Sequence, residues 1–476
     1  MQQPQAQPAE KFSEKFTDHA VNGVNLTEQT ADFVAAHRTE DVRQLALKAK
    51  RVEGLDLPLA LDQIAGWQIA CKKLPQWASC EGIIYPPHIS MEQCSSQFTA
   101  QYKSEIAQTL LTPAVTVRAR MSDSAESDNQ TTKSEPQLSD SGESDNCEVE
   151  MCLRMSDSPE SDTLVARSSM VDLTGGFGVD FSYLARGFSQ ATYVERQRHL
   201  CDLAEHNMAA LGLDQARIVC DDGVEYLRQM DPVDFIYLDP ARRDEHGSRT
   251  YAIEDCTPNV LELRDLLLAK SQCTLVKLSP MLDWRKAVAD FDGTVREVHI
   301  VATGNECKEL LLVLGQQVHE EPSAPRVFCV NDNQRIDYDS AAYTQGLRIG
   351  GKPLPEAKNY LYEPNASIMK AGCFDLVEER FGVTQVGPSS HLFVSATPIA
   401  DFPGRGFAIE AIGGMNKKDI KRLLNGTKQA NIAVRNFPLT APQLRKKLKL
   451  ADGGPVYLFG TTMQGCDHVL LRTSKI

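Results

Sequence analysis

Apolar and polar positions alternate along the middle of the chain as buried strands and amphipathic helices require. From Ser169 to Leu314 short apolar runs recur, separated mostly by segments with helical spacing such as Leu200–Leu211 and Val260–Lys270. The predicted strands are Met170–Leu173, Ala191–Val194, Ala216–Val219, Phe235–Leu238, Leu275–Leu278, Val295–Val301 and Leu310–Leu314. Strands that alternate with helices predict a doubly wound, mostly parallel α/β sheet of seven strands, within a domain at 163–321. The loop at 302–306 is short, so we expect the last two strands to form an antiparallel hairpin at the sheet edge.

The segments on either side have different patterns. Ile64, Trp67 and Cys71 share one helical face, and Lys72-Lys73-Leu74-Pro75 predicts a helix end. A further capped helix is predicted from Ser90 through Lys103. We therefore expect an N-terminal helical domain at 1–116, with a loose start of about 25 residues. Beyond the sheet, two mixed α+β units are predicted at 326–397 and 401–476.

The charge is distributed unevenly. The chain of 476 residues has a net charge of −14, of which −10 falls between Met121 and Asp162. Three near-copies of one Ser-Asp-Ser phrase lie in this segment, which has almost no aromatic or β-branched residues, so residues 117–162 are expected to be a disordered acidic insertion. Between Met415 and Lys449, ten Lys/Arg stand against the single acid Asp419, a net charge of +9. A near-neutral body thus carries one acidic and one basic block.

The bulk composition excludes several classes of protein. An apolar fraction of 42% is enough for several cores, so a wholly disordered chain is excluded. No apolar stretch approaches the roughly 18 residues of a membrane span, and no secretory signal is visible at the N-terminus. The 13 cysteines include no Cys-x-x-Cys pair, which disfavours a disulfide scaffold or a zinc site. We expect a cytoplasmic protein with neither a membrane partner nor a metal.

A glycine-rich loop follows the first predicted strand. In Asp172-x-Thr174-x-Gly176-x-Gly178 the glycines allow a tight turn and a close approach of the backbone to a ligand. A helix that opens near Asp180 would add free N–H groups. Asp172 would repel a pyrophosphate but could bind the ammonium of a methionine moiety, and the third glycine of a dinucleotide loop is replaced by Phe181. The loop disfavours NAD and favours S-adenosylmethionine (SAM), with a purely structural turn as the alternative.

Acids also follow the next two predicted strands. Glu195 ends the second strand, where a carboxylate can accept hydrogen bonds from both ribose hydroxyls. Asp222 follows the third strand, where an acid can accept from the adenine amino group. Because open α/β sheets bind ligands at the carboxyl ends of their strands, these positions support SAM as the cofactor. Either acid alone would be interpreted as a solvated loop carboxylate.

The fourth predicted strand ends in Asp239-Pro240-Ala241-Arg242-Arg243. A carboxylate beside a proline-fixed carbonyl can accept from one exocyclic amine and orient its lone pair for methyl transfer. Asp239 and Pro240 are therefore the expected catalytic pair. Arg242 stands where an aromatic ring would otherwise stack on a base, and it could hold a phosphate or stack itself. Loop salt bridges are the alternative for the two arginines. Lys277-Leu278-Ser279-Pro280 ends the fifth strand and faces the same crevice.

The basic block is predicted to form two short helices with cations on one side and leucines on the other. Nine net charges in so short a segment are typical of a surface that binds a phosphate backbone, and Phe437 could add base stacking. A solvated basic face is the alternative. The expected RNA-binding residues are Lys417, Lys418, Lys421, Arg422, Arg435, Arg445, Lys446, Lys447 and Lys449.

The chain resembles a family of bacterial class I SAM-dependent methyltransferases that have a helical N-terminal region, a ferredoxin-like domain and a C-terminal THUMP-like domain. The resemblance covers nearly the whole chain except the acidic insertion. It implies a ferredoxin-like fold at about 326–395, a THUMP-like fold beyond it, and an RNA substrate. The text that carries it is Lys73-Leu-Pro-Gln-Trp77, Glu92-Gln-Cys-Ser-Ser96, Asp172-Leu-Thr-Gly-Gly-Phe-Gly-Val-Asp180, Leu238-Asp-Pro-Ala-Arg-Arg243, Tyr362-Glu-Pro-Asn365, Arg435-Asn-Phe-Pro438 and Leu444-Arg-Lys-Lys-Leu-Lys449.

Together these observations predict a Rossmann-like methyltransferase core that transfers a methyl group from SAM to a base nitrogen of a structured RNA, a tRNA or an rRNA. Asp239 would orient the base nitrogen. Two alternatives remain open: a methyltransferase for small molecules or proteins, and an RNA-binding protein that keeps the sheet without catalysis.

Overall fold

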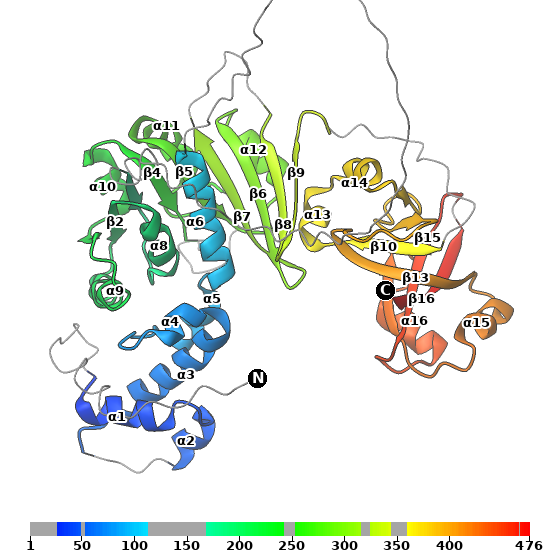
Figure 1. Cartoon of the computed structure of the whole chain (residues 1–476), viewed down its shortest axis with the longest axis horizontal. Coiled ribbons are helices and arrows are strands. Elements are labelled where there is room, and N and C mark those ends of the chain that lie inside the picture. The colour runs from blue at the N-terminus through cyan, green and yellow to red at the C-terminus, as the bar shows by residue number, and fades with distance from the viewer. Residues whose placement is uncertain are drawn as a thin grey trace, which may run out of the picture.

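The computed structural model describes residues 26–48, 53–112, 168–241, 253–315, 324–343, 359–465 and 467–476. Three parts follow one another along the chain: a group of helices, an α/β part around a nine-stranded sheet, and an α/β part around a seven-stranded sheet (Figure 1). The predicted acidic insertion and Arg242 lie outside the described residues.

The N-terminal part is helical, as predicted. Asp56 caps its longest helix by accepting from the Leu59 N–H, and that helix ends at Lys73 just before Pro75. Ser96 caps the last helix, which runs along the first sheet in Figure 1 and buries Tyr102 and Ile106 against it. The described helices are α1 (Glu28–His37), α2 (Val42–Lys48), α3 (Leu57–Lys73), α4 (Pro75–Ser79), α5 (His88–Gln93) and α6 (Gln97–Leu111).

The first sheet contains all seven predicted strands. Its order is β3-β2-β1-β4-β5-β7-β6-β8-β9, with β1 to β5 parallel to one another and β7 antiparallel to β5. Its strands are β1 (Ser169–Asp172), β2 (Gln190–Glu195), β3 (Ala216–Cys220), β4 (Val233–Leu238), β5 (Ser271–Leu278), β6 (Val295–Thr303), β7 (Glu306–Gly315), β8 (Arg326–Asn331) and β9 (Gln334–Asp339).

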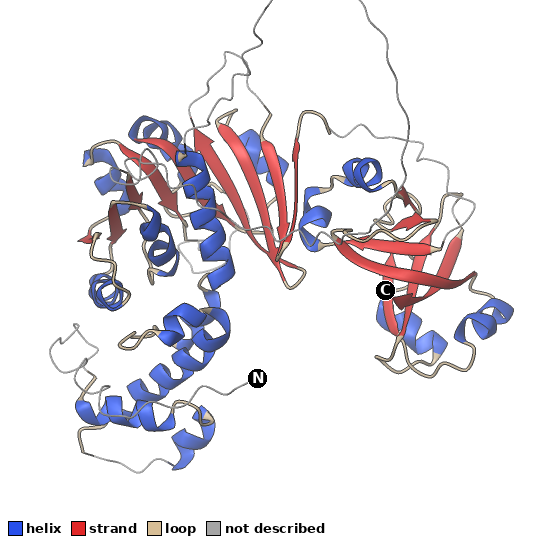
Figure 2. Cartoon of the chain, in the orientation of Figure 1, coloured by secondary structure: helices blue, strands red, loops and turns tan. Residues whose placement is uncertain are grey.

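Helices cover both faces of this sheet (Figure 2), and neighbouring strand residues point to opposite sides. Val171 and Ile236 pack against α10, α11 and α12, whereas Met170 and Phe235 pack against α6, α8 and α9. Burial on both sides explains why the strands are continuous apolar runs. The helices are α8 (Val179–Leu184), a 3-10 turn (Ala185–Gly187), α9 (Arg198–Ala210), α10 (Gly223–Gln229), α11 (Val260–Lys270) and α12 (Trp284–Asp290).

The edge of this sheet differs from the prediction. β6 and β7 form the expected antiparallel hairpin, but β6 also pairs in parallel with β8, and β9 is the edge strand. Residues 326–339, which were expected to open the ferredoxin-like domain, therefore belong to the first sheet. An amphipathic hairpin has the same sequence pattern whichever sheet it joins, so the pattern could not identify its partner.

The second sheet is shared by the last two predicted domains. Its order is β11-β12-β10-β13-β16-β15-β14, so β10 of the first of these units pairs with β13, the strand that opens the second. Ile368 and Val377, from its first two helices, share a buried cluster with Val298 and Val327 of the first sheet, which joins the two sheets. The elements are β10 (Tyr360–Pro364), α13 (Ala366–Ala371), α14 (Phe374–Phe381), β11 (Thr384–Gln385), β12 (Phe393–Ser395), β13 (Gly404–Gly413), α15 (Lys417–Leu424), β14 (Asn431–Arg435), α16 (Ala441–Leu448), β15 (Val456–Thr462) and β16 (His468–Lys475).

Candidate active site

A cavity of about 1320 Å³ lies at the carboxyl ends of the parallel strands. All predicted cofactor and transfer residues that the structure describes line it, although they come from four strand ends. They are Asp172, Thr174, Gly176, Gly178, Asp180, Glu195, Asp222, Asp239 and Pro240. Ser90, Glu92, Cys94 and Ser95 also line it, so the N-terminal helices form part of its wall.

The glycine-rich loop has no room for side chains at the critical turn. A Cβ on Gly175 would lie 2.2 Å from the Tyr193 ring, and Gly176 and Gly178 have φ values of +53° and +75°. The Gly176 N–H donates to Glu195 Oε2 at 3.1 Å, and the Tyr193 hydroxyl donates to the Gly176 carbonyl. The second strand therefore holds the loop at both a donor and an acceptor.

The predicted ribose and adenine carboxylates are also used in local structure. Glu195 Oε1 accepts from the Gln197 N–H at 2.9 Å, which fixes the strand end. Asp222 Oδ1 accepts from the N–H groups of Val224 and Glu225 and so caps α10. A carboxylate oxygen has two lone pairs, so these bonds leave each group able to accept from a ligand in the cavity.

Asp172 is held in a buried position, with 1% of its surface exposed. Burial raises the pKa of its carboxyl, hydrogen bonds from Thr174 lower it, and the negative charges of Asp180 and Asp239 raise it, so that together they bring the pKa to about 8. Thr174 donates its N–H to Asp172 Oδ1 at 2.9 Å, and its hydroxyl accepts from the Asp239 N–H at 2.6 Å. One threonine thus links the glycine loop to the predicted transfer residue.

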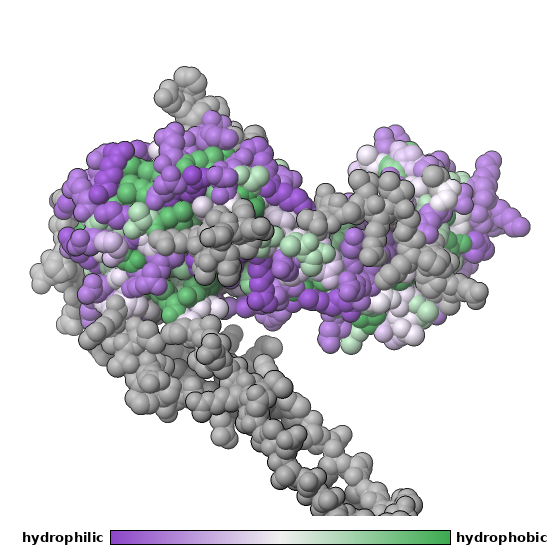
Figure 3. All heavy atoms as spheres, turned by 90° about the horizontal axis from the view of Figure 1, so that it is seen from above, coloured by the Kyte–Doolittle hydropathy of each residue, from purple (hydrophilic) through white to green (hydrophobic). Residues whose placement is uncertain are grey.

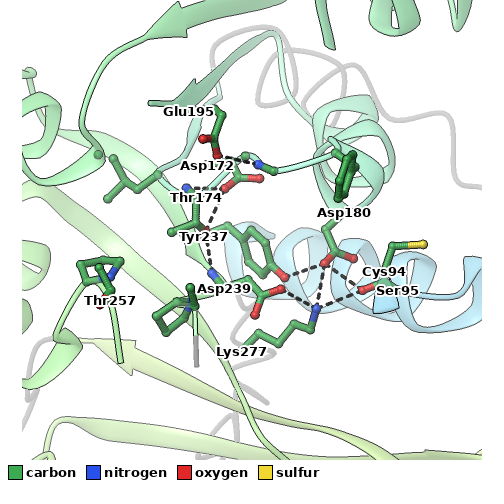
Figure 4. A pocket seen from close by; sticks show the side chains of 18 of the residues that line it. Cys94, Ser95, Asp172, Thr174, Asp180, Glu195, Tyr237, Asp239, Thr257 and Lys277 are labelled. Atoms are coloured by element: carbon green, nitrogen blue, oxygen red, sulfur yellow. Dashed lines mark hydrogen bonds and ion pairs between the residues drawn. The ribbon is translucent and has the colours of Figure 1, made fainter. Parts of the chain in front are cut away.

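Asp239 belongs to a cluster of charges that extends from the cavity into the protein, which we call the lysine–carboxylate cluster: Lys103, Asp180, Asp239, Lys277 and Glu309 (Figure 4 shows three of these together). Lys277 Nζ lies 2.6 Å from Asp239 Oδ2 and 3.5 Å from Asp180 Oδ2. Lys103 Nζ lies 2.6 Å from Glu309 Oε2 and 3.1 Å from Asp180 Oδ1. Two ammonium groups thus alternate with three carboxylates.

Two hydroxyl groups complete this cluster. Ser95 Oγ accepts from Lys103 at 3.2 Å and from Lys277 at 3.3 Å, and it lies 2.9 Å from Asp180 Oδ2. The Tyr237 hydroxyl donates to Asp180 at 2.7 Å. Asp180 is therefore held by four groups inside the protein, although it also lines the cavity that it was predicted to serve.

The charges in the cluster support one another. Burial lowers the pKa of Lys277, but the carboxylates of Asp239, Asp180 and Glu309 outweigh it and hold that pKa above its ordinary range. Burial likewise raises the pKa of Asp180, but Lys103 and Lys277 outweigh it and hold that pKa well below its ordinary value. At neutral pH the ammonium of Lys277 is therefore charged beside Asp239.

Sequence reasoning identified Lys277 as facing the crevice but missed Lys103 and Glu309. Two signals could have found them. Lys103 falls on the buried stripe of α6 between Ala100 and Ala107, and Glu309 stands at the start of the apolar run of β7. A charged residue at an otherwise apolar position indicates a buried partner.

The predicted RNA-binding cations divide into two groups. Arg435 pairs with the buried Glu363 at 2.7 Å, Arg445 donates to the carbonyls of Ala430 and Ala451, and Arg422 donates to that of Ile412. These three arginines hold the second sheet and its helices together. The lysines are all exposed, three on α15 and three in or directly after α16: Lys417, Lys418, Lys421, Lys446, Lys447 and Lys449.

The described ranges contain neither a metal-binding cluster nor a membrane-spanning helix. No group of three or more His, Cys, Asp or Glu side chains there is arranged to hold a metal ion. None of the helices built from those residues combines the length and apolar character needed to cross a bilayer.

Comparison with known proteins identifies the parts of the chain. A model of a ferredoxin-like domain matches residues 360–403, and a model of a THUMP domain-like family matches residues 404–475. The crystal structure of a candidate methyltransferase from Porphyromonas gingivalis W83 is 28% identical, covers 94% of this chain and 97% of its own, and has a TM-score of 0.71. A SAM-dependent methyltransferase from Agrobacterium tumefaciens is 18% identical over 32% of this chain and 56% of its own, with a TM-score of 0.25. No curated protein matches the chain.

The predicted architecture is therefore confirmed: a methyltransferase fold followed by ferredoxin-like and THUMP-like parts. The ferredoxin-like match begins at residue 360, beyond the hairpin 326–339 that joins the first sheet.

Proposed function

We propose that this protein is a SAM-dependent methyltransferase that acts on a structured RNA. The observation that carries the proposal is that acids from successive strand ends line one cavity with a glycine-rich loop, next to Asp239 and Pro240. The fold that it shares with a candidate methyltransferase over 94% of its length supports the same interpretation.

The cavity suits the cofactor chemically. SAM supplies a methyl group on a positively charged sulfonium. Asp172 would bind the methionine ammonium, Glu195 the ribose hydroxyls and Asp222 the adenine amino group, each with lone pairs that point to a cationic or donor group. Glycine at position 175 lets the loop lie close against the Tyr193 ring, and the φ of +53° at Gly176 forms the turn that lines the cavity.

Asp239 and Pro240 would hold the group that is methylated. Asp239 is partly exposed to the cavity, while its backbone N–H is fixed by Thr174 and its carboxylate by Lys277. Because Asp239 is held at both its backbone and its side chain, its carboxylate is fixed in place. It can accept a hydrogen bond from the group to be methylated and orient the lone pair of that group, whether the group is a base amine or a ribose hydroxyl.

The RNA would be held by the exposed lysines on α15 and α16, which we call the lysine surface. In Figure 3 the C-terminal part ends in a strongly hydrophilic protrusion, at the end of the molecule where Figure 1 places α15. Lysines that project from two helices suit a phosphate backbone. The THUMP-like match to residues 404–475 supports this assignment, since such domains are expected to bind RNA.

The proposal is tested by two measurements on the full chain. Titration calorimetry should detect binding of SAM and of its demethylated product, and label from methyl-labelled SAM should enter RNA from cells in which the gene is deleted. Binding without any transfer to RNA, while proteins or small molecules from the same cells are labelled, would rule out the RNA substrate.

Cofactor binding should release a proton. At pH 7 the Asp172 carboxyl, with a pKa of about 8, is largely protonated, and a bound cation favours its ionised form. Up to about one proton should therefore leave per SAM bound. Calorimetry at pH 7 in two buffers with different ionisation enthalpies measures this number. Asp172→Asn keeps the shape of the side chain but has no titratable group, so it should bind SAM more weakly and release no proton. Equal proton release from the variant and the wild type would contradict the assignment of Asp172 to the SAM ammonium.

Reversing charge on the lysine surface should weaken RNA binding and its salt dependence. In Lys446→Glu/Lys447→Glu the slope of log affinity against log salt should become less steep by about one for each phosphate that the variant no longer binds. Filter binding of bacterial total RNA at several salt concentrations measures the slope. Arg217→Glu/Lys286→Glu, an equal change of charge on exposed residues of β3 and α12, is the matched control and should keep the wild-type slope. Equal effects of the two double variants would show that only net charge matters.

A further inference from the structure

We infer that the group methylated by this protein is a hydroxyl, the ribose 2′-hydroxyl of the RNA, and that Lys277 stabilises the oxyanion that develops on it. This inference rests on the proposed RNA methyltransferase function and names its acceptor atom. It departs from the base nitrogen that the Asp239-Pro240 motif predicts from sequence.

An ammonium group lies at the transfer site. Lys277 comes from β5, lines the cavity and lies 2.6 Å from the carboxylate of Asp239. Its side chain is 11% exposed, and that of Asp239 is 36% exposed, so both can be reached from the cavity. A substrate atom that contacts Asp239 is therefore also close to a fixed positive charge.

That charge has opposite effects on the two candidate acceptors. An amine nitrogen that attacks a methyl group gains positive charge, which a neighbouring ammonium opposes. A hydroxyl oxygen must lose its proton as it attacks, so negative charge develops on the oxygen, which a fixed donor in a buried site stabilises. An ammonium beside the catalytic carboxylate therefore favours a hydroxyl.

Buried groups around Lys277 keep its ammonium charged. Lys103 is fully buried beneath it, where it pairs with Glu309 and Asp180, and Ser95 accepts from both lysines. The two lysines and three carboxylates come from α6, α8, β5, β7 and the residue after β4. Taking so many charges out of water is costly, and a site that only orients an amine needs one carboxylate. A role for the ammonium of Lys277 in the reaction explains why the protein keeps the lysine–carboxylate cluster.

The wall of the cavity around Asp239 has few aromatic side chains among the described residues. Apart from His199, the aromatic side chains among the described residues that line the cavity are Phe177 and Tyr237. Phe177 packs on a cluster with Leu26 and Ile84, and Tyr237 is 1% exposed with its hydroxyl on Asp180. Tyr237 therefore offers no free face on which a flipped base could stack, and part of Phe177 is taken up by packing on that cluster. A ribose needs no such platform.

The methyl group passes from sulfur to the 2′-oxygen in one displacement step. The 2′-oxygen forms a bond to the methyl carbon, the carbon–sulfur bond breaks, and its electron pair stays on sulfur, which becomes a neutral thioether. The hydroxyl proton passes to the Asp239 carboxylate and then to solvent. The positive charge of Lys277, which Asp239, Asp180 and Ser95 hold in place, stabilises the negative charge on the oxygen during the attack, and Lys277 keeps its own protons.

The identity of the product decides between the two acceptors. RNA from cells in which the gene is deleted is incubated with the purified full chain and methyl-labelled SAM, digested to nucleosides and analysed by mass spectrometry. We expect the labelled methyl group on the ribose of the nucleoside and not on its base. In a parallel alkaline digest the label should stay in dinucleotides, because a 2′-O-methyl group prevents cleavage of the neighbouring phosphodiester bond. A labelled base would overturn this inference and leave the RNA methyltransferase function intact. Absence of label from RNA, with SAM bound, would overturn the proposed function and this inference with it.

Variants of Lys277 test the direction of the electrostatic effect. Lys277→Met should lower kcat by about 10²- to 10³-fold, as expected for loss of one oxyanion donor, and Lys277→Arg should recover part of it. Calorimetric SAM binding and circular dichroism show whether each variant is folded. A folded Lys277→Met protein that transfers methyl groups at the wild-type rate or faster would contradict the role of Lys277. Should Lys277→Met fail to fold, Lys277→Arg and the product analysis of the wild type still decide the question.

Discussion

Replacing Asp239 with asparagine is expected to reduce methyl transfer to RNA by about 10³-fold while the protein still folds and binds SAM. Asparagine keeps the shape of the side chain and leaves the backbone bond to Thr174 in place. It cannot take up the proton that the acceptor group loses. Lys277 keeps a second carboxylate partner, since Asp180 lies 3.5 Å away.

Initial rates of label transfer to RNA, combined with calorimetry of SAM binding, measure this effect. The matched control is Asp214→Asn, an exposed aspartate outside the cavity, which should behave as the wild type. Should Asp239→Asn retain a rate within about tenfold of the wild type, the carboxylate would not be the general base, because that role contributes at least about 10²-fold.

Removing the deeper lysine should have the largest effect on stability. Lys103 has no exposed surface and faces both Glu309 and Asp180, so Lys103→Met leaves two carboxylates buried with one fewer cation. Loss of one partner from a buried ion pair typically costs about 3–5 kcal/mol. Because α6 also packs on the first sheet, we expect an earlier unfolding transition of the N-terminal helices and the sheet together.

Urea unfolding followed by circular dichroism and by the fluorescence of the tryptophans measures this destabilisation. Lys103→Met/Glu309→Leu removes both members of the pair, and it should unfold at a higher urea concentration than Lys103→Met alone, because the uncompensated charge is gone. Lys72→Met, an exposed lysine at the end of α3, is the control and should shift the midpoint little. Equal destabilisation of the single and the double variant would show that Lys103 contributes by packing and not by its charge.

The basic block shows how far charge alone can be interpreted. Nine cations there were predicted to bind RNA, yet Arg422 and Arg445 donate to carbonyls of their own domain and Arg435 to the Glu363 carboxylate of the preceding one. Net charge counts side chains without regard to their neighbours. Only the positions of Glu363 and of the carbonyls separate the arginines that hold the fold from the lysines that remain exposed.

The amino-acid sequence by itself determined seven of the nine strands of the first sheet and the acids at the ends of its parallel strands. A parallel strand covered on both faces has to be a continuous apolar run, and the next polar residue marks its end, so Asp172, Glu195 and Asp239 could be assigned to strand ends without a structure. Local rules of this kind need only neighbouring residues.

The tertiary structure alone decided two further features: the sheet that residues 326–339 join, and the cluster in which Lys103, Lys277 and Glu309 meet. Ser95 and Glu309 are 214 positions apart and 3.1 Å apart in space. The physical reason is that a buried charge gains its partner only when the chain folds, because water satisfies it equally well before then. The spacing of residues along the chain therefore does not predict which charged side chains become buried next to one another.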